Sequence, residues 1–281
     1  MKNFLLRFYR YCLPVLFTYM MITGCNSHES VKTGTPDSGN APLANIKIEK
    51  AGIILTAKAT ADRLTTKDTL IFHDFEQPTE QFPAVIIDYH KTFQTLEGIG
   101  GAITDAAAET FYKMPAVVQE EILNAYFDSI KGIGYSLCRT HINSCDFSSE
   151  SYSYAPTPGD TLLSDFSIAH DLKYRIPLIK KAIEKSGSRL KLFASPWSPP
   201  AWMKTNNDML HGGKIKPEYL KVWAEYYVRF FEAYQQEGIA FWGFTIQSEP
   251  LAVQRWESCI YSAEYELRFV RDFLGPRIEK S

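Results

Sequence analysis

Glu249 is the side chain of this sequence whose type and position best suit acid–base chemistry. The apolar run 241–246 predicts a buried strand, and Glu249 lies just beyond the end of that run. A glutamate at the mouth of such a strand is partly desolvated, and desolvation favours the protonated acid near the working pH. A general acid that protonates a glycosidic oxygen needs this property. The spacing leaves two other roles open, because Glu249 could also cap the next helix or pair with Arg139.

Two further segments place aromatic or acidic side chains where strands are expected to end. The segment 195–206 contains Trp197 and Trp202 among three prolines, a composition that excludes regular structure. Trp197 could form an apolar wall for a sugar ring, whereas Trp202 better suits core packing. In the segment 100–105, glycines permit close backbone approach. Asp105 could accept hydrogen bonds from two adjacent sugar hydroxyls, or cap the helix that follows it.

The elements that must position these residues alternate from residue 94 onward. We expect strands at 96–104, 135–142, 190–194 and 241–246, and helices at 106–112, 115–130, 171–185, 217–236 and 263–274. Strands that alternate with helices of this length predict an α/β fold built from parallel βα units. In a parallel barrel the chemistry lies in the loops after the strands. That rule gathers these residues at one end: Asp105, Arg139, His141, Trp197 and Glu249.

The segment before residue 94 divides into three parts. Residues 1–24 contain basic residues and then a short apolar run, and Cys25 follows them. This order resembles a bacterial lipoprotein signal peptide over 1–24. A plain secretory signal followed by a chance cysteine is the alternative. Residues 25–42 have the composition of a flexible tether, and residues 43–93 predict β-sandwich strands. We therefore expect an exported protein, lipid-anchored at Cys25 to a bacterial membrane on the periplasmic side or the cell surface. The expected sandwich strands are 46–48, 52–57, 68–73 and 84–88.

Composition and charge exclude several classes of protein. The 281 residues are 45% hydrophobic and 22% charged with a net charge of -2, which is ordinary for a globular protein and argues against nucleic-acid binding. Outside the leader, Cys138, Cys145 and Cys259 match no zinc spacing. We expect them to be buried thiols, and one disulfide pair among them is the alternative. The histidines, His141 among them, form no ligand pattern. We expect no metal and no cofactor.

Taken together, four segments resemble glycoside hydrolase family 30, which includes glucosylceramidase and β-1,6-glucanases. The order and spacing of the segments match, and the resemblance extends over residues 43–281. It implies a (β/α)8 TIM barrel joined to a β-sandwich that the N-terminal strands help to form. It also implies hydrolysis with retention of configuration through two glutamates. The four segments are 98–107, 139–147, 195–206 and 247–250.

Carried over position by position, the resemblance assigns roles to individual residues. Glu249 matches the general acid/base at the end of the fourth strand. Asp105 matches an aspartate that holds the outer hydroxyls of the sugar, and Trp197 lines the same subsite. Arg139 matches an arginine near the nucleophile, where its charge would keep a carboxylate ionised. Trp256 lies in a segment that is closer to the β-1,6-glucanase branch, and it could flank the subsite.

Two features depart from the family. The residue before the acid/base is usually Asn and here is Ser248, whose shorter side chain we expect to reach the 2-hydroxyl only through water. The family's nucleophile lies on a strand beyond residue 281, so only four βα units of the barrel are expected in 94–281. Retention needs two carboxylates about 5–5.5 Å apart. We therefore expect the 281-residue product alone to be inactive, and its open strand edges to make it poorly soluble.

The sequence thus predicts the front part of a retaining β-glycoside hydrolase that acts on β-glucosides or β-glucans, with β-1,6-glucan as one candidate. A surface lipoprotein that binds glycans without cleaving them is the alternative. Ser248 and the missing nucleophile favour this alternative, whereas Glu249 argues against it. The expected partners are a carbohydrate and, through Cys25, a membrane. Neither the linkage nor the aglycone follows from the sequence.

Overall fold

The computed structural model describes residues 48–74, 81, 83, 85, 88 and 91–281. These residues belong to two compact units, with the boundary between Leu96 and Glu97. The predicted signal peptide 1–24, the lipidation site Cys25 and the tether 25–42 lie outside the described residues and stay predictions.

The N-terminal unit contains one antiparallel pair of strands. β1 (Lys50–Leu55) pairs with β2 (Thr65–Ile71), so that Lys50 lies opposite Ile71 and Leu55 opposite Thr65. Two of the four expected strands are therefore present, shifted by two or three residues. The other two, at 46–48 and 84–88, fall mostly outside the described residues. A two-stranded sheet is marginally stable by itself, and the β-sandwich stays a prediction.

The second unit is built on a parallel sheet, as the sequence predicts. β3 (Leu137–Ile142), β4 (Lys191–Pro196) and β5 (Gly243–Phe244) are parallel and adjacent in chain order. The segment 99–103 lies beside β3, because Ile103 N donates to Arg139 O at 2.8 Å and Arg139 N donates to Gly101 O at 3.1 Å. The four expected strands are thus present, although the first is only a hydrogen-bonded bridge and the last is shorter than expected.

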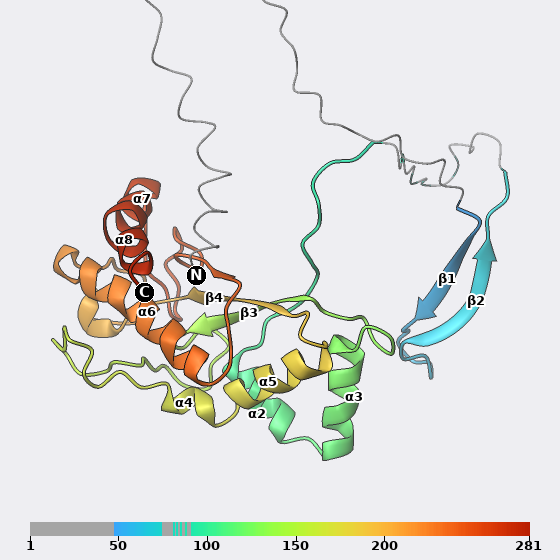
Figure 1. The fold of residues 1–281 in the computed structure, drawn as a ribbon, viewed down its shortest axis with the longest axis horizontal. Coiled ribbons are helices and arrows are strands. Elements are labelled where there is room, and N and C mark those ends of the chain that lie inside the picture. The colour runs from blue at the N-terminus through green and yellow to red at the C-terminus, as the bar shows by residue number, and fades with distance from the viewer. Residues whose placement is uncertain (1–47, 75–80, 82, 84, 86–87, 89–90) are drawn as a thin grey trace, which may run out of the picture. The chain divides into compact units, whose positions relative to one another are not determined.

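Helices follow each parallel segment and lie along both sides of β3 and β4 (Figure 1). The expected helix 171–185 is divided into two, α4 and α5, and the other helices occupy the expected places. Two short 3-10 turns, η2 (Ala201–Met203) and η3 (Pro217–Tyr219), lie between β4 and α6. The helices are α2 (Asp105–Tyr112), α3 (Ala116–Phe127), α4 (Ala169–Leu172), α5 (Arg175–Lys185), α6 (Leu220–Gln236), α7 (Ala263–Phe269), the π-helical η4 (Val270–Leu274) and α8 (Gly275–Ile278).

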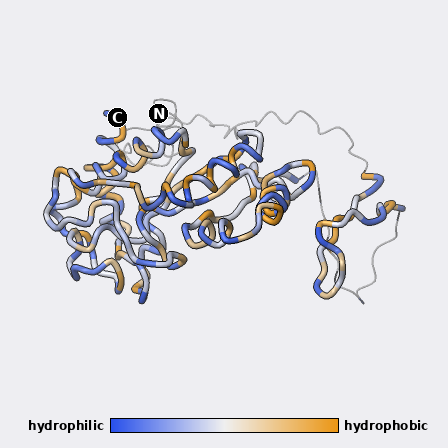
Figure 2. Tube along the Cα trace, turned by 90° about the horizontal axis from the view of Figure 1, so that it is seen from below, coloured by the Kyte–Doolittle hydropathy of each residue, from blue (hydrophilic) through white to orange (hydrophobic). Residues whose placement is uncertain are grey.

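The longest helix, α6, shows why the sequence folds in this way. Apolar residues recur every three or four positions, so they share one face, and that face is buried. Figure 2 shows the matching change between hydrophobic and hydrophilic residues along the helices. The helix ends where Gly238 takes a left-handed φ of 79° and Ile239 N donates back to Tyr234 O at 2.9 Å. The buried face comprises Leu220, Trp223, Tyr227, Phe230 and Tyr234.

Among the described residues, no helix has the length and apolar character that crossing a bilayer requires.

Gly100 marks the closest approach between segment 99–103 and β3. A Cβ added there would lie 1.5 Å from Leu137 O, whereas at Gly101 the nearest atom would be 3.4 Å away, in the Tyr135 ring. We expect Gly100→Ala to lower the free energy of unfolding by at least about 2 kcal/mol, because the added methyl forces the strands apart. Gly101→Ala should change it by less than about 1 kcal/mol. Urea unfolding of both variants measures the difference, and equal losses would contradict the expectation.

Candidate active site

The carboxyl ends of the parallel strands bring the predicted residues to one edge of the sheet. The register pairs Arg139 with Phe193 and His141 with Ser195, so the ends of β3 and β4 coincide. Beyond β5, Thr245 N donates to Ala194 O at 2.9 Å and Ser248 N donates to Pro196 O at 2.8 Å. These bonds hold the residues just before Glu249 alongside the end of β4.

Arg139 ties these strand ends together. Its Nε donates to Ser195 Oγ at 2.8 Å and its Nη2 donates to Ser248 Oγ at 3.0 Å. The guanidinium carbon lies 4.3 Å from the centre of the half-buried Trp197 ring, a favourable cation–π arrangement. Burial lowers the pKa of Arg139, but the nearby carboxylates of Asp146 and Glu249 oppose this shift. The site therefore contains a positive charge that no ion pair neutralises among the described residues.

Glu249 is exposed and has a left-handed φ of 49°. Such a backbone costs a non-glycine residue about 1–2 kcal/mol, and outliers of this kind cluster at functional sites. Its carboxylate makes no hydrogen bond or ion pair with a described residue, so the pair with Arg139 is not formed. Ser262, and not Glu249, caps the next helix, α7. The expected partial desolvation is wrong, because β5 ends at Phe244 and a solvent-open loop carries Glu249.

Asp146 is a carboxylate of this site that the sequence analysis did not single out. It lies in the loop after β3 and is exposed. Partial burial and then repulsion from Glu249 and Glu257 raise its pKa, while Trp197 stabilises its charged form in part. Asp146, Trp197 and Glu249 therefore lie close together, and with Arg139 they form the solvent-facing surface at the strand ends that is named the opening below. The sequence signal was available, because Asp146 follows a predicted strand end just as Asp105 does.

Asp105 lies below that opening. Its side chain is 3% exposed, its Oδ1 is 3.1 Å from His141 Nε2, and Ser148 Oγ donates to the same oxygen at 2.8 Å. The capping role considered for Asp105 is wrong, because Thr104 Oγ1 accepts from Ala107 N and caps α2. Its predicted contact with sugar hydroxyls stays a prediction, and the Oδ1 oxygen is already engaged within the protein.

A buried ion pair supports the end of β3 from beneath. Arg175 pairs with Asp171, and the hydroxyls of Tyr154 and Tyr234 donate to Asp171 Oδ2 at 2.7 and 2.8 Å. Burial alone would raise the pKa of Asp171, but the Arg175 cation reverses this effect and lowers it. Arg175 Nη1 also donates to His141 O at 2.9 Å. Burial and then the same cation lower the pKa of His141, which favours the neutral imidazole.

The remaining predicted residues divide between the core and the rim. Trp202 is buried, as expected, and its Nε1 donates to Ala155 O at 2.9 Å. Trp256 is half-buried, and within the described part of the chain no hydrogen bond or ring contact joins it to Trp197 or Glu249. Its flanking role stays a prediction. Cys138, Cys145 and Cys259 are free and buried, as expected, and the disulfide pair that the sequence left open is not formed among them.

The geometry matches a known family. A model described as the glycosyl hydrolase family 30 TIM-barrel domain matches residues 96–281. The chain belongs to glycoside hydrolase family 30. This match confirms the family that four short segments indicated, and it confirms the α/β class. The parallel sheet is part of a TIM-barrel domain.

Relatives in this family include proteins from animals and solved bacterial and fungal structures. Putative glucosylceramidase 3 of Caenorhabditis elegans is 36% identical over 247 residues, which cover 85% of this chain and 47% of that protein. Lysosomal acid glucosylceramidase of Mus musculus is 38% identical over 200 residues, covering 68% and 39%. The structure of the endo-β1,6-glucanase BT3312 has a TM-score of 0.63 at 27% identity, covering 69% and 43%. The chain thus spans about half the length, or less, of the curated relatives it matches.

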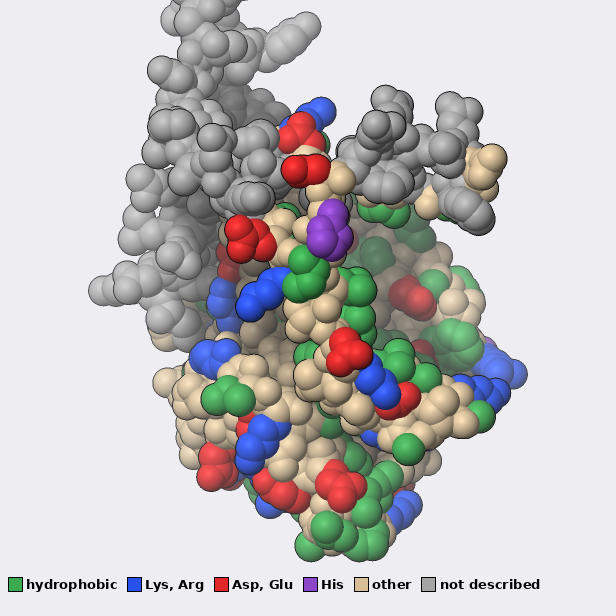
Figure 3. Space-filling model, turned by 90° about the vertical axis from the view of Figure 1, so that its right-hand side faces the viewer, with side chains coloured by type: hydrophobic (Ala, Val, Ile, Leu, Met, Phe, Trp, Pro, Cys, Tyr) green, Lys and Arg blue, Asp and Glu red, His purple; other side chains and the backbone are tan. Residues whose placement is uncertain are grey.

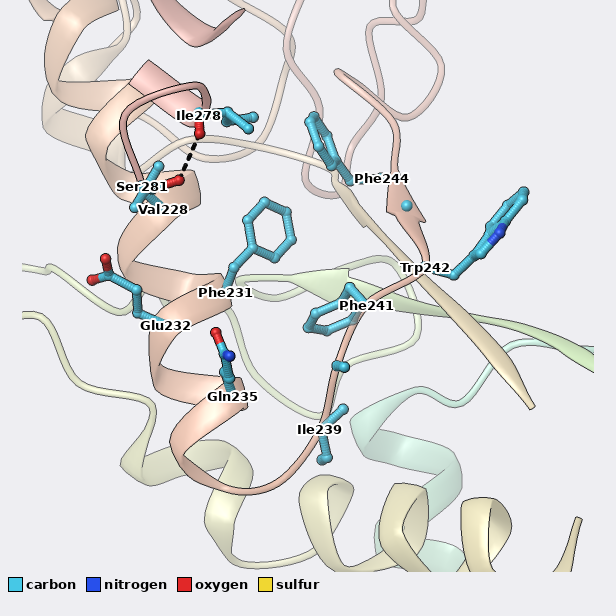
Figure 4. A pocket seen from close by; sticks show the side chains of 12 residues that line it. Val228, Phe231, Glu232, Gln235, Ile239, Phe241, Trp242, Phe244, Ile278 and Ser281 are labelled. Atoms are coloured by element: carbon cyan, nitrogen blue, oxygen red, sulfur yellow. Dashed lines mark hydrogen bonds between the residues drawn. The ribbon is translucent and has the colours of Figure 1, made fainter. Parts of the chain in front are cut away.

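A separate hollow lies away from the family 30 site. A cavity of about 510 Å³ is lined by residues of α6, of the segment 239–244 and of the C-terminal end, and Figure 4 shows Phe231 and Gln235 on one side of it and Phe241 and Trp242 on the other. It follows the outer edge of β5, which pairs only with β4 among the described strands. No residue of the Arg139–Glu249 opening lines it, so it is not the active site.

The molecular surface agrees with the charge balance of the sequence. Acidic and basic side chains are interspersed among uncharged ones on the face drawn in Figure 3. Within the described part of that face no single sign covers a broad area, which fits a net charge of -2.

Lys204 links the loops that follow β4 and β5. Its side chain is fully buried, and its Nζ donates to Met209 O at 3.0 Å and to Ser258 O at 2.7 Å. Burial lowers the pKa of Lys204 to about 8. The unfolded value is about 10.4, so between these pH values the unfolded chain binds more protons than the folded one. Stability from this group therefore rises as the pH increases through that range.

A comparison with Lys204→Met isolates this effect, because methionine does not titrate. Between pH 8 and pH 10 we expect the free energy of unfolding of the unsubstituted protein to gain about 2 kcal/mol relative to the variant. Urea unfolding of both proteins at the two pH values measures this double difference. A difference that stays constant would show that Lys204 keeps an ordinary pKa.

Proposed function

We propose that the chain carries the acid/base side of a retaining β-glycoside hydrolase that acts on β-glucosides or β-glucans, with Glu249 as the general acid/base. The observation that carries this proposal is the unpaired, exposed carboxylate of Glu249 on a strained backbone, at the strand ends that Arg139 joins. A strand-end carboxylate is where a TIM barrel places its chemistry. Membership of family 30 supports the reaction class.

The neighbouring side chains have distinct parts in this mechanism. The exposed face of Trp197 packs against the sugar ring while Arg139 supports the indole. Asp146 accepts hydrogen bonds from sugar hydroxyls beside Glu249. Ser248 Oγ already accepts from Arg139, so its own hydrogen remains available to a substrate oxygen. Glu249 gives its proton to the departing oxygen, and later takes one from the attacking water.

Retention requires a second carboxylate about 5–5.5 Å from the first. The positive charge of Arg139 suits a position beside that nucleophile, because it favours the ionised form. Two relatives bear the name glucosylceramidase and one solved neighbour the name endo-β1,6-glucanase. Both names denote cleavage at a glucose residue, and the segment around Trp256 favours the glucanase branch. β-1,6-glucan is therefore the first polymer to test.

Export and lipid anchoring at Cys25 complete the proposal, and the order of basic residues, apolar run and cysteine supports them. We expect the protein made in a Gram-negative host to incorporate an alkyne-labelled fatty acid and to sediment with membranes. Cys25→Ser should abolish the label, whereas Cys12→Ser, within the predicted leader, should retain it. Equal labelling of both variants would refute attachment at Cys25.

The catalytic part is tested with Glu249→Gln, assayed on an aryl β-glucoside and on β-1,6-glucan. Where the unsubstituted protein hydrolyses either substrate, we expect Glu249→Gln to lower kcat/KM at least about 100-fold, because general acid catalysis contributes a factor of this size or more. Glu237→Gln is the matched control, since Glu237 pairs with Lys180 at the surface and should change kcat/KM less than twofold.

Binding measurements separate the hydrolase from the glycan-binding alternative. Gluco-oligosaccharide affinity should fall at least tenfold in Trp197→Ala and in Asp146→Asn, but not in Trp242→Ala, a partly exposed tryptophan outside the site. Affinity that depends on Trp197 without any Glu249-dependent cleavage would select the glycan-binding lipoprotein. Affinity that is unchanged in both site variants would reject this opening as a sugar site.

A further inference from the structure

Three side chains of metal-binding type meet below the opening, where the sequence predicts no metal site. They are Asp105, His141 and Cys145, all buried, and their ligand atoms lie within 4.8 Å of one another. Asp105 and His141 are 36 positions apart in the chain. No short-range spacing pattern could therefore reveal the cluster, and only the pairing of segment 99–103 with β3 brings it together.

His141 has polar neighbours at both ring nitrogens, and its Nε2 faces the cluster. Nδ1 contacts Asn143 O and lies 2.6 Å from Arg175 Nη1, and Nε2 lies 3.1 Å from Asp105 Oδ1. A guanidinium can only donate, so its contact calls for an unprotonated Nδ1, whereas the contact with Asn143 O calls for Nδ1–H. Asp105 N donates to Nε2 at 3.1 Å, which calls for a lone pair on Nε2. A lone pair on Nε2 is what a metal ion at this cluster would require.

A second observation concerns Asp105 itself. Its other oxygen, Oδ2, is buried and has no hydrogen-bond partner among the described residues. The residue is 2% exposed, so water does not replace the missing partner freely. A buried carboxylate oxygen without a partner leaves the desolvation penalty of that oxygen uncompensated. The Sγ atom of Cys145 completes the cluster, with Ser148 Oγ as a weak partner at 3.7 Å.

We propose that Asp105, His141 and Cys145 form a binding site for one thiophilic divalent cation of the zinc type. Imidazole nitrogen, thiolate sulfur and carboxylate oxygen are the ligands that Zn²⁺ takes in proteins, and three of them leave a fourth position open. Binding forms a metal–sulfur bond, breaks the S–H bond of Cys145 and releases that proton to solvent. Thiolate and carboxylate together balance the two positive charges.

The surroundings can take such an ion after a limited rearrangement. The nearest cation, Arg175, pairs with Asp171, and its Nη1 also lies 2.6 Å from His141 Nδ1. With Nε2 on the metal, Nδ1–H would donate to Asn143 O, the kind of partner that metal-bound histidines need, and Arg175 Nη1 would have to move away from Nδ1. Tetrahedral ligands around zinc are roughly 3.5 Å apart. The widest separation, up to 4.8 Å, must therefore shrink by about 1 Å.

An ion at this site would also act on the proposed sugar site, although its binding does not depend on that function. Cys145 directly precedes Asp146, so a metal–sulfur bond fixes the loop that carries the Asp146 carboxylate. The other anchor of this loop is Glu257, which accepts from Ser144 Oγ and Ser151 Oγ at 2.7 Å each. Occupancy would thus hold the rim of the opening in one arrangement.

Cobalt(II) provides a direct test, because a thiolate bound to it gives a charge-transfer band in the near ultraviolet. The metal-free chain is titrated with Co²⁺, and bound metal is counted by mass spectrometry under non-denaturing conditions. We expect one equivalent with a thiolate band that added Zn²⁺ removes. Cys145→Ser should abolish the band, and Asp105→Asn should weaken Co²⁺ binding at least tenfold. Cys259→Ser is the matched control, another buried free thiol that should keep the band.

Circular dichroism of each variant checks that the fold persists. Cys12 and Cys25 are present in every variant, so they cannot account for a difference in the band between variants. The proposal is overturned by an absent band in the folded unsubstituted chain. It is equally overturned by a band that survives Cys145→Ser or disappears in Cys259→Ser. Because the readout is spectroscopic, a failure here leaves the hydrolase proposal intact, and a failure of hydrolysis leaves the metal site intact.

Discussion

The guanidinium of Arg175 is 1% exposed, and the arrangement of the site depends on how its charge is compensated. Asp171 supplies the counter-charge, and Tyr154 and Tyr234 supply hydrogen bonds to the same carboxylate. Breaking such a pair leaves a lone charge in a medium of low dielectric and costs about 3–5 kcal/mol. Since Arg175 also holds His141 O, the end of β3 keeps its position only while this pair is intact.

Closer to solvent, Arg139 has a different role because its partners are neutral. Two serine hydroxyls and one indole hold the guanidinium in place without cancelling its charge. The carboxylates of Asp146 and Glu249 lie near enough to favour the charged form of Arg139. One edge of the sheet thus contains a buried cation that is paired with a carboxylate, Arg175, and a partly exposed cation whose hydrogen-bond partners are neutral, Arg139.

Periodicity predicts the parts of this fold that depend on local patterns. The apolar face of α6 and the strand before Glu249 follow directly from residue spacing, and so does the position of Trp202 in the core. Side-chain orientation does not follow, because it depends on partners that are distant in sequence. Asp105 follows a strand and looks available to a ligand, yet His141 and Ser148 engage it.

The same limit applies to Asp146, and for the opposite reason. Its place after a predicted strand end is a signal that many polar loop residues share, and its proximity to Trp197 and Glu249 on later elements is what singles it out. The N-terminal strands show a further case, where two runs of alternating residues pair with each other and the wider sandwich stays a prediction. Long-range pairing, and not the strength of a pattern, decides which predictions hold.

The left-handed backbone at Glu249 sets the proposed acid/base role against stability at a single position. Glycine adopts this conformation freely, so a glycine there would relieve the strain and make the domain more stable. The carboxylate would be lost in the same step. Selection for thermal tolerance alone would therefore favour glycine at this position, whereas the proposed chemistry requires the glutamate.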